Sequence, residues 1–168
     1  MAKKVGFDIK KVAAPPEGEP WIVHTRELIT SPAWRARSIH CVRLLDFLEI
    51  EHMNHAGREN GYLFATYDQL QTFGIGRRFI SPTITEAERL NLIEANRGVR
   101  KSVVESHLSA FRLTYLHSKV FDPNGTKYYA KATDEWKRIT AERAIDIIHE
   151  IRILKRGKNN MRCYKGEL

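Results

Sequence analysis

Apolar and polar positions follow two different periods along this chain, and these periods predict its elements. Residues 38–53 carry apolar side chains at helical spacing, which predicts a helix with one apolar face. Residues 92–96 and 111–116 are rich in types that favour β-strands, and the second segment alternates apolar with polar positions. Residues 63–65, which follow two glycines, predict a short third strand in the same sheet.

Two helices separated by a glycine turn are predicted between the first helix and the strand pair. Thr66 and Gln69 have the spacing of a capping box, in which two side chains satisfy free amide groups at a helix start. Gly74 suits the end of that helix, because glycine adopts positive φ at little cost, and Gly76 suits the start of the next one. Ile75 is expected to be an apolar plug between them.

The second of these helices is expected to have one buried face and one polar face. Ile80, Ile84 and Ala87 recur at spacings of four and three and predict the buried face. For the arginines of the polar face, contact with DNA and simple solvation are the two interpretations. The polar face carries side-chain types that bind DNA bases and phosphates, and its members are Arg77, Arg78, Ser81, Thr85 and Arg89.

Pro82 leaves two interpretations for the start of this helix. Proline inside a helix removes an amide donor and crowds the carbonyl of Arg78, which costs roughly 3 kcal/mol if nothing compensates. In one interpretation the helix begins near Gly76 and is kinked. In the other, which we favour, an extended turn precedes Ser81, which is the N-cap of a helix over about 82–90.

These elements resemble the winged helix-turn-helix family of DNA-binding proteins. The resemblance covers about residues 38–116 and rests on a glycine turn followed by two arginines, on Ile84, on the sequence Leu90–Ile93 and on the strand Phe111–Leu116. Asn91 stands where the family commonly has glycine, and asparagine also tolerates the left-handed conformation. The proline in the second helix and the long span between the two strands depart from the family pattern.

The resemblance implies a mainly α fold with a small antiparallel β wing, to which the chain adds a long C-terminal helix. It also implies that the second helix enters the major groove of DNA and that the wing lies on a neighbouring phosphate strand. The turn between the wing strands is basic, so Arg97, Arg100 and Lys101 are candidate phosphate contacts, with a solvated turn as the alternative.

The segments that flank the winged unit are expected to differ in order. Residues 1–20 combine lysines with an Ala-Pro-Pro stretch and predict a flexible arm. Residues 21–132 are expected to form the winged domain with a lead-in and a wing extension, which includes a turn at 122–125. Residues 133–156 predict a long helix, and residues 157–168 a basic tail.

The predicted C-terminal helix has an apolar stripe that allows two interpretations. It either packs on its own domain or forms a homodimer through residues 136–154, as in DNA-binding proteins that occupy paired half-sites. Gly157 suits the end of this helix. Arg156 and Lys158 are candidate DNA contacts of the tail, with a solvated end as the alternative. The stripe consists of Trp136, Ile139, Ala144, Ile147, Ile148, Ile151 and Leu154.

Charge and composition narrow the partners and the compartment. The chain has 168 residues and a formal net charge of +8, which favours a polyanion as partner. No run approaches the ~18–20 apolar residues of a membrane span, and the Met-Ala-Lys-Lys start lacks a signal-peptide core. Cys41 and Cys163 are far apart in the sequence and are expected to be reduced thiols. We therefore expect a cytoplasmic protein associated with the nucleoid.

No pattern in the chain predicts an enzyme, a metal site or a cofactor. The histidines His40, His52 and His55 match no zinc spacing, and no cysteine pair stands near them. The glutamates nearby lack an ordered nucleophile or base, and the chain contains no P-loop and no GxGxxG sequence. We therefore predict no catalytic residues, no cofactor and no metal ligands.

The predicted function is binding of double-stranded DNA without chemistry. Transcriptional regulation and accessory roles in replication or recombination, on a phage or another mobile element, all fit this prediction. The alternative is a protein-interaction module, because winged helices also hold protein partners. A basic module of that kind would act as an inhibitor that docks on a nucleic-acid-binding complex of a host.

Overall fold

The computed structural model describes residues 18–97 and 109–163, apart from the side chains of Arg97 and of residues 157–163. Residues 1–17 of the predicted arm, the tip of the predicted wing and the last residues of the tail therefore lie outside the described residues. In chain order the elements are α2 (Arg26–Thr30), α3 (Pro32–Arg35), α4 (Ile39–Asn54), β1 (Leu63–Ala65), α5 (Tyr67–Thr72), α6 (Arg77–Arg89), β2 (Ile93–Arg97), β3 (Ser109–Leu113), β4 (Ser118–Phe121), β5 (Lys127–Ala130), the 3₁₀ helix η1 (Glu135–Arg138) and α7 (Ala141–Cys163).

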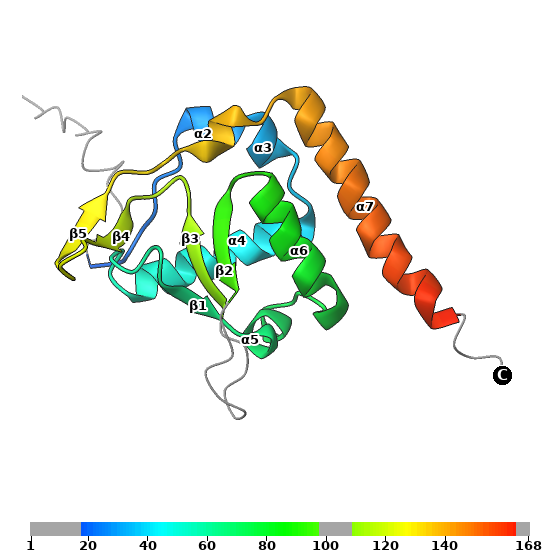
Figure 1. The fold of residues 1–168 in the computed structure, drawn as a ribbon, viewed down its shortest axis with the longest axis horizontal. Coiled ribbons are helices and arrows are strands. Elements are labelled where there is room, and N and C mark those ends of the chain that lie inside the picture. The colour runs from blue at the N-terminus through cyan, green and yellow to red at the C-terminus, as the bar shows by residue number, and fades with distance from the viewer. Residues whose placement is uncertain (1–17, 98–108, 164–168) are drawn as a thin grey trace, which may run out of the picture.

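The strands form two antiparallel sheets. The first has the order β1-β3-β2, with Leu63 opposite Phe111 and Ile93 opposite Leu113. The second is the hairpin β4–β5, which lies at the opposite end of the molecule from α7 (Figure 1). About half of the described residues are helical, so the chain belongs to the α+β class.

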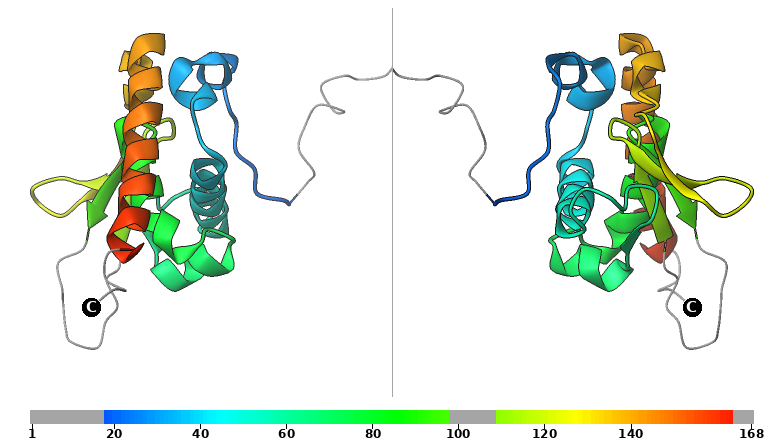
Figure 2. Two further views of the ribbon diagram at one scale, coloured as in Figure 1. Left: turned by 90° about the vertical axis from the view of Figure 1, so that its right-hand side faces the viewer. Right: turned by 90° about the vertical axis from the view of Figure 1, so that its left-hand side faces the viewer.

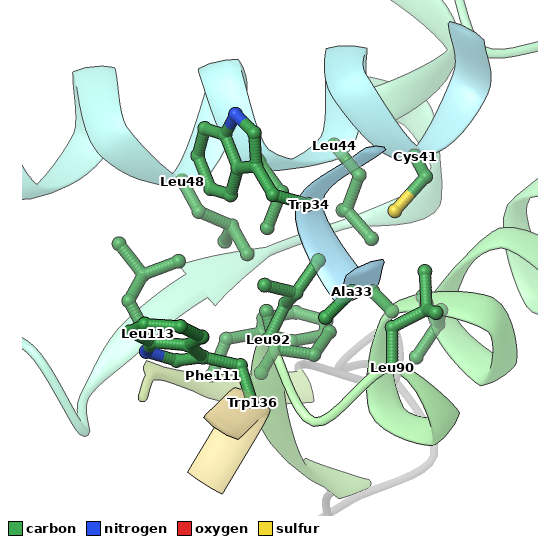
Figure 3. Packing of buried hydrophobic residues seen from close by; sticks show 14 of the residues in the cluster. Ala33, Trp34, Cys41, Leu44, Leu48, Leu90, Leu92, Phe111, Leu113 and Trp136 are labelled. Carbon is green, nitrogen blue, oxygen red and sulfur yellow. The ribbon is translucent and has the colours of Figure 1, made fainter. Parts of the chain in front are cut away.

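The core lies between α4, the first sheet and α6. One face of the sheet contributes side chains that meet leucines of α4 and the rings of the N-terminal and C-terminal segments (Figure 3). Leu44, Leu48, Phe111 and Leu113 are each at most 1% exposed, because strand alternation and helical spacing both direct them inward. Trp34 from α3 and Trp136 from η1 close this core from outside the predicted winged unit.

The turn between α5 and α6 confirms the local predictions. Thr66 Oγ1 accepts from the Gln69 amide at 3.1 Å, and Gln69 Oε1 accepts from the Thr66 amide at 2.8 Å, which completes a capping box. Gly74 has φ of +97°, the conformation that glycine reaches without strain. Ile75 is fully buried between the helices. Asn91 has φ of +54°, so it takes the left-handed position predicted for it.

The predicted start of α6 at Ser81 is wrong. The helix begins at Arg77 with Gly76 as N-cap, and Pro82 lies inside it. The side chain of Pro82 is buried, and α6 packs against α4, α5, β2 and α7. These tertiary contacts stabilise the helix and offset the loss of the backbone hydrogen bond that proline cannot donate.

The predicted single helix from residue 133 is also wrong in its bounds. Asp134 adopts a left-handed conformation and accepts from the Trp136 indole, and a short 3₁₀ helix follows. The chain is then extended at Ile139, and α7 begins at Ala141 with Thr140 accepting from the Arg143 amide at 3.2 Å. The predicted end at Gly157 is wrong as well: the helical backbone continues to residue 163, since one glycine costs a helix only about 1 kcal/mol.

The lead-in and the wing extension are ordered elements. Two short helices, α2 and α3, share Ser31, which ends the first and caps the second. The turn at 122–125 joins β4 to β5 and stands out from the body, on the side away from α4 (Figure 2). Within the described part of the chain, no helix combines the length and the apolar character that crossing a membrane needs.

Candidate nucleic-acid interface

The outward side of α6 brings together the five side chains that the sequence assigned to it. Opposite them, Ile80, Ile84 and Ala87 are buried, which confirms the predicted inner face. The three arginines are exposed, whereas the serine and the threonine are half-buried. We call this set the α6 surface, and it consists of Arg77, Arg78, Ser81, Thr85 and Arg89.

The first two arginines of the α6 surface have different neighbours. Arg77 Nη1 donates to Asp68 Oδ1 of α5 at 2.5 Å, and both side chains are largely exposed. The guanidinium of Arg78 lies 4.5 Å from the ring centre of Phe79, which stacks in turn on His40 of α4. Exposed ion pairs of the first kind contribute at most about 1 kcal/mol, so a phosphate can displace the carboxylate.

Arg89 joins the α6 surface to the C-terminal helix. It donates to a carboxylate oxygen of Glu150 on α7, and Arg143 Nη1 contacts the other oxygen of the same group at 3.1 Å. One carboxylate is thus shared by two cations at the border between α6 and α7. The helix α7 packs against this side of α6, so it limits the part of the α6 surface that a ligand can reach beside Arg89.

An acidic residue also belongs to this side of α6. Glu88 lies three and seven positions after Thr85 and Ser81, so helical spacing places it on the same face. Glu88 and Thr85 both have partners within the protein. The α6 surface is therefore a mixed surface with a cationic excess and not a uniform cationic stripe.

A buried carboxylate holds α6 in place, and the sequence did not reveal it. Glu86 is 3% exposed, and its oxygens accept from the amide and the hydroxyl of Ser38 at 2.6 and 2.8 Å. Lys155 of α7 donates to the same carboxylate at 3.1 Å. Ser38 is the N-cap of α4, so this one group links α4, α6 and α7. No local pattern marks Glu86, because its partners lie 48 and 69 positions away.

The structure describes only some of the DNA contacts predicted in the wing and in the tail. Arg156 is exposed on α7. Arg97 ends β2, but its side chain lies outside the described residues, as does that of Lys158. Arg100 and Lys101 fall in the segment between β2 and β3 that is outside the described residues altogether.

The three histidines of the rejected metal hypothesis serve separate neighbours. His40 stacks on Phe79, His55 contacts Glu51 at 3.2 Å, and His52 faces His117. Burial lowers the pKa of both His40 and His52, because it penalises the charged imidazole. In residues 18–97 and 109–163, no cluster of three or more histidine, cysteine, aspartate or glutamate side chains has the arrangement of a metal site.

A second polar cluster below the surface ties the N-terminal segment to the core. Glu49 Oε1 accepts from the Tyr115 hydroxyl at 2.6 Å and contacts His24 Nε2 at 2.8 Å. Tyr115 and His24 also meet the ring of Trp34 edge-on. Burial and the charge of Glu49 raise the pKa of the Tyr115 hydroxyl, so this group stays a hydrogen-bond donor.

The chain was also compared with known proteins. No protein-family model, curated protein or solved structure matches it. The assignment of a function to the α6 surface therefore depends on its own geometry and charge.

Proposed function

We propose that the chain is a winged helix protein that binds double-stranded DNA through the α6 surface. The observation that carries this proposal is the division of one helix into two faces. The outward face has three exposed arginines and two half-buried hydroxyls, and the opposite face is buried. The order α4-β1-α5-α6-β2-β3, with the sheet order β1-β3-β2, supports the winged helix assignment.

Binding would proceed by exchange of partners and not by chemistry. The arginines are suited to guanine edges and to phosphates, and the hydroxyls of Ser81 and Thr85 to phosphates. Arg77 and Arg89 leave the carboxylates of Asp68 and Glu150 when a phosphate arrives. Arg97, Arg100 and Lys101 are the proposed wing contacts, and Arg156 and Lys158 the proposed tail contacts. The proposed setting is the nucleoid, in regulation, replication or recombination.

The apolar stripe of α7 bears on the proposed homodimer. Ala144, Ile147 and Ile151 are buried, and α7 packs against α6 and α3 of the same chain. Ile145 and Ile153 are 56% and 69% exposed, so a dimer through residues 136–154 would use this second side of the helix. We propose that the buried stripe serves the monomer and that any dimer uses the exposed isoleucines.

The test is a titration of the full chain against a labelled random duplex of about 30 base pairs, roughly three helical turns. Affinity should fall steeply between about 50 and 200 mM salt, because each neutralised phosphate releases counterions. The variant Arg77→Ala with Arg78→Ala should bind about tenfold more weakly, with an unchanged melting temperature.

The matched control removes two exposed arginines at another site. Arg26→Ala with Arg138→Ala makes the same change of net charge on α2 and η1. An equal loss in this control would show that charge alone drives binding and would remove the α6 surface from the interface.

The second candidate function is a protein-interaction module. It is favoured by one observation, namely that Arg77 and Arg89 already have carboxylate partners within the chain. A stoichiometric protein complex that depends on Arg77 and Arg78, together with no duplex binding at low salt, would establish this function in place of DNA binding.

A further inference from the structure

The β4–β5 hairpin presents aromatic rings and lysines on one side. Residues that face each other across an antiparallel pair point to the same side, as do residues two apart on one strand. Lys119 lies opposite Tyr129, and Phe121 lies opposite Lys127. These four side chains therefore share one side of the hairpin, with a ring and a cation alternating in both directions.

Tyr62, which precedes β1, extends this pattern. Its ring meets Phe121 edge-on with centroids 5.7 Å apart, and Lys119 Nζ lies 5.4 Å from the Tyr62 centroid. Lys119 Nζ is also 5.7 Å from the centroid of Phe121, and Lys127 Nζ is 5.1 Å from that of Tyr129. We call this set the hairpin surface, and its members are Tyr62, Lys119, Phe121, Lys127 and Tyr129.

The rings of the hairpin surface are open to solvent although they are large and apolar. Tyr62, Phe121 and Tyr129 are 40%, 45% and 44% exposed. Three half-exposed rings with ammonium groups between them form a grouped surface and not scattered apolar residues, which would need no explanation. Cation–π contacts place the lysines beside the rings, and the exposed part of each ring is open to a ligand.

A buried amide fixes the base of the hairpin surface. Asn60 is fully buried, its Nδ2 donates to the carbonyls of Leu113 and His117 at 2.8 and 3.0 Å, and its Oδ1 accepts from the Leu113 amide at 2.7 Å. The Asn60 carbonyl accepts from the Lys119 amide at 2.8 Å. Gly61 follows with φ of +103°, and a Cβ there would approach the Lys119 carbonyl to 3.1 Å. The Tyr62 ring and β4 are thus held in a fixed relation before any ligand binds.

Charge near the hairpin surface is positive but partly compensated. Lys119 Nζ donates to Glu59 at 2.5 Å, and the pKa of Glu59 lies below its ordinary value because of this hydrogen bond and the charges of Lys119 and Lys127. Asp122 is occupied in the turn, where it accepts from the amides of Asn124 and Thr126. Lys127 and the next cation along the chain, Lys131, are exposed.

We propose that the hairpin surface binds single-stranded DNA, with bases stacked on its rings and phosphates beside its lysines. Each nucleotide of a single strand offers one π-face and one negative charge, which matches the alternation of rings and ammonium groups. An acidic protein segment would match the lysines but not the rings. In a duplex the bases already stack on one another, so their faces are closed to the hairpin surface. The choice of DNA over RNA rests on the proposed function, whereas the single-strand character rests on the rings.

The test uses the full chain and a labelled oligothymidylate of about 20 nucleotides, longer than the site size of one small binding domain. Phe121→Ala with Tyr129→Ala should weaken this binding at least about fivefold for each ring, because base–aromatic stacking is of that order. Tyr129→Phe keeps the ring and should bind as the parent chain does.

The matched control is Tyr128→Ala. Tyr128 is 51% exposed and belongs to the same hairpin, but its side chain points to the other side, opposite Val120. This variant should bind oligothymidylate within about twofold of the parent chain, a change below the stacking effect. Equal losses in the control and in the double variant would overturn the proposal, as would no binding of oligothymidylate at low salt.

Two further arms separate this proposal from the proposed function. The double variant should keep its affinity for the random duplex, and Arg77→Ala with Arg78→Ala should keep its affinity for oligothymidylate. A parent chain that binds oligothymidylate but not the random duplex would contradict the α6 assignment and leave the hairpin assignment standing. Tighter binding of oligouridylate RNA than of oligothymidylate would overturn the DNA assignment. A protein complex that depends on Phe121 and Tyr129, without single-strand binding, would overturn the whole proposal.

Discussion

The α6 surface and the hairpin surface both present cations, but the cations have different neighbours. On α6, Arg77 and Arg89 lie beside carboxylates, so each charge is compensated until a ligand replaces its partner. On the hairpin, Lys119 and Lys127 lie beside aromatic rings. Lys119 is also paired with Glu59, whereas Lys127 lies beside the π-face of Tyr129, which does not neutralise it. The first arrangement suits recognition by exchange of charge, and the second suits stacking with charge assistance.

The two surfaces also have separate supports. Glu86 holds α6 to α4 and α7 through Ser38 and Lys155, whereas Asn60 holds the base of the hairpin to the end of β3. Both supports are buried polar groups with several partners, which makes them costly to disturb. Substitutions of each support can therefore show whether the surfaces are independent.

The largest expected effect is that of Asn60→Ala. This change leaves an amide and several carbonyls without a partner in a fully buried place, so stability should fall by about 3 kcal/mol or more. Urea unfolding measures this loss. Asn54→Ala is the control, because Asn54 is exposed at the end of α4. Similar stabilities of the two variants would contradict the role assigned to Asn60.

Glu86→Gln should have the next largest effect. The glutamine side chain keeps one acceptor oxygen, but an NH2 group replaces the other. That group faces the donors of Ser38 and Lys155, which should cost about 1–3 kcal/mol of stability. Lys155→Gln should cost less, about 1 kcal/mol, because the Glu86 carboxylate keeps both hydrogen bonds from Ser38 and loses one of three partners. Thermal unfolding of both variants measures these losses. A larger loss in Lys155→Gln than in Glu86→Gln would refute this description of the link.

Neutralising the carboxylates of the α6 surface should strengthen duplex binding. Asp68→Asn with Glu150→Gln removes the partners of Arg77 and Arg89, and affinity at low salt should rise about three- to tenfold. Glu27→Gln with Glu51→Gln makes the same change of net charge away from α6 and is the control. An equal gain in the control would attribute the effect to net charge alone.

Lys127→Gln tests the electrostatic share of the hairpin surface. It removes one exposed cation while the rings stay, so affinity for oligothymidylate should fall a few-fold and the salt slope by about 0.7. A titration at several salt concentrations measures both quantities. A loss as large as that of the two ring substitutions would show that charge, and not stacking, dominates this surface.

The smallest expected effect is a dependence of stability on pH through His52. Burial lowers the pKa of His52 in the folded chain, and the nearby His117 lowers it further. The unfolded chain therefore takes up the proton first, and stability falls as pH decreases through about 6.5. Urea unfolding at several pH values should show a shallower fall in His52→Gln. A steeper fall would contradict the sign.

The sequence predicted most of the local structure around α6 because the signals there are local. A capping box, a glycine at a helix end and an asparagine with positive φ are each specified within a few residues. The inner face of α6 and the three strands of the first sheet also follow from periodicity. These predictions are confirmed for the described residues, except that the strand predicted over 111–116 spans Ser109–Leu113.

The errors share a different cause, namely contacts between distant segments. Pro82 was expected to delay the start of α6, but burial against several elements keeps it inside the helix. The break at Asp134 depends on its own left-handed conformation and on the Trp136 indole, which a helical stripe of apolar residues does not reveal. Asn60 and Glu86 were missed for the same reason, since most of their partners are more than forty positions away.

The sequence Asn60–Gly61 is prone to deamidation, and folding protects it. An asparagine before glycine is the pair most open to deamidation, because the next backbone nitrogen can attack the side-chain amide without hindrance from a Cβ. In the folded chain this side chain is buried and its nitrogen is held by three carbonyls. An unfolded copy lacks that protection, and an aspartate formed there has no amide to offer those carbonyls on refolding. The molecules able to regain the hairpin surface are therefore those that have spent little time unfolded. A mass increase located at Asn60, and not at the exposed Asn124–Gly125 pair, would measure that time.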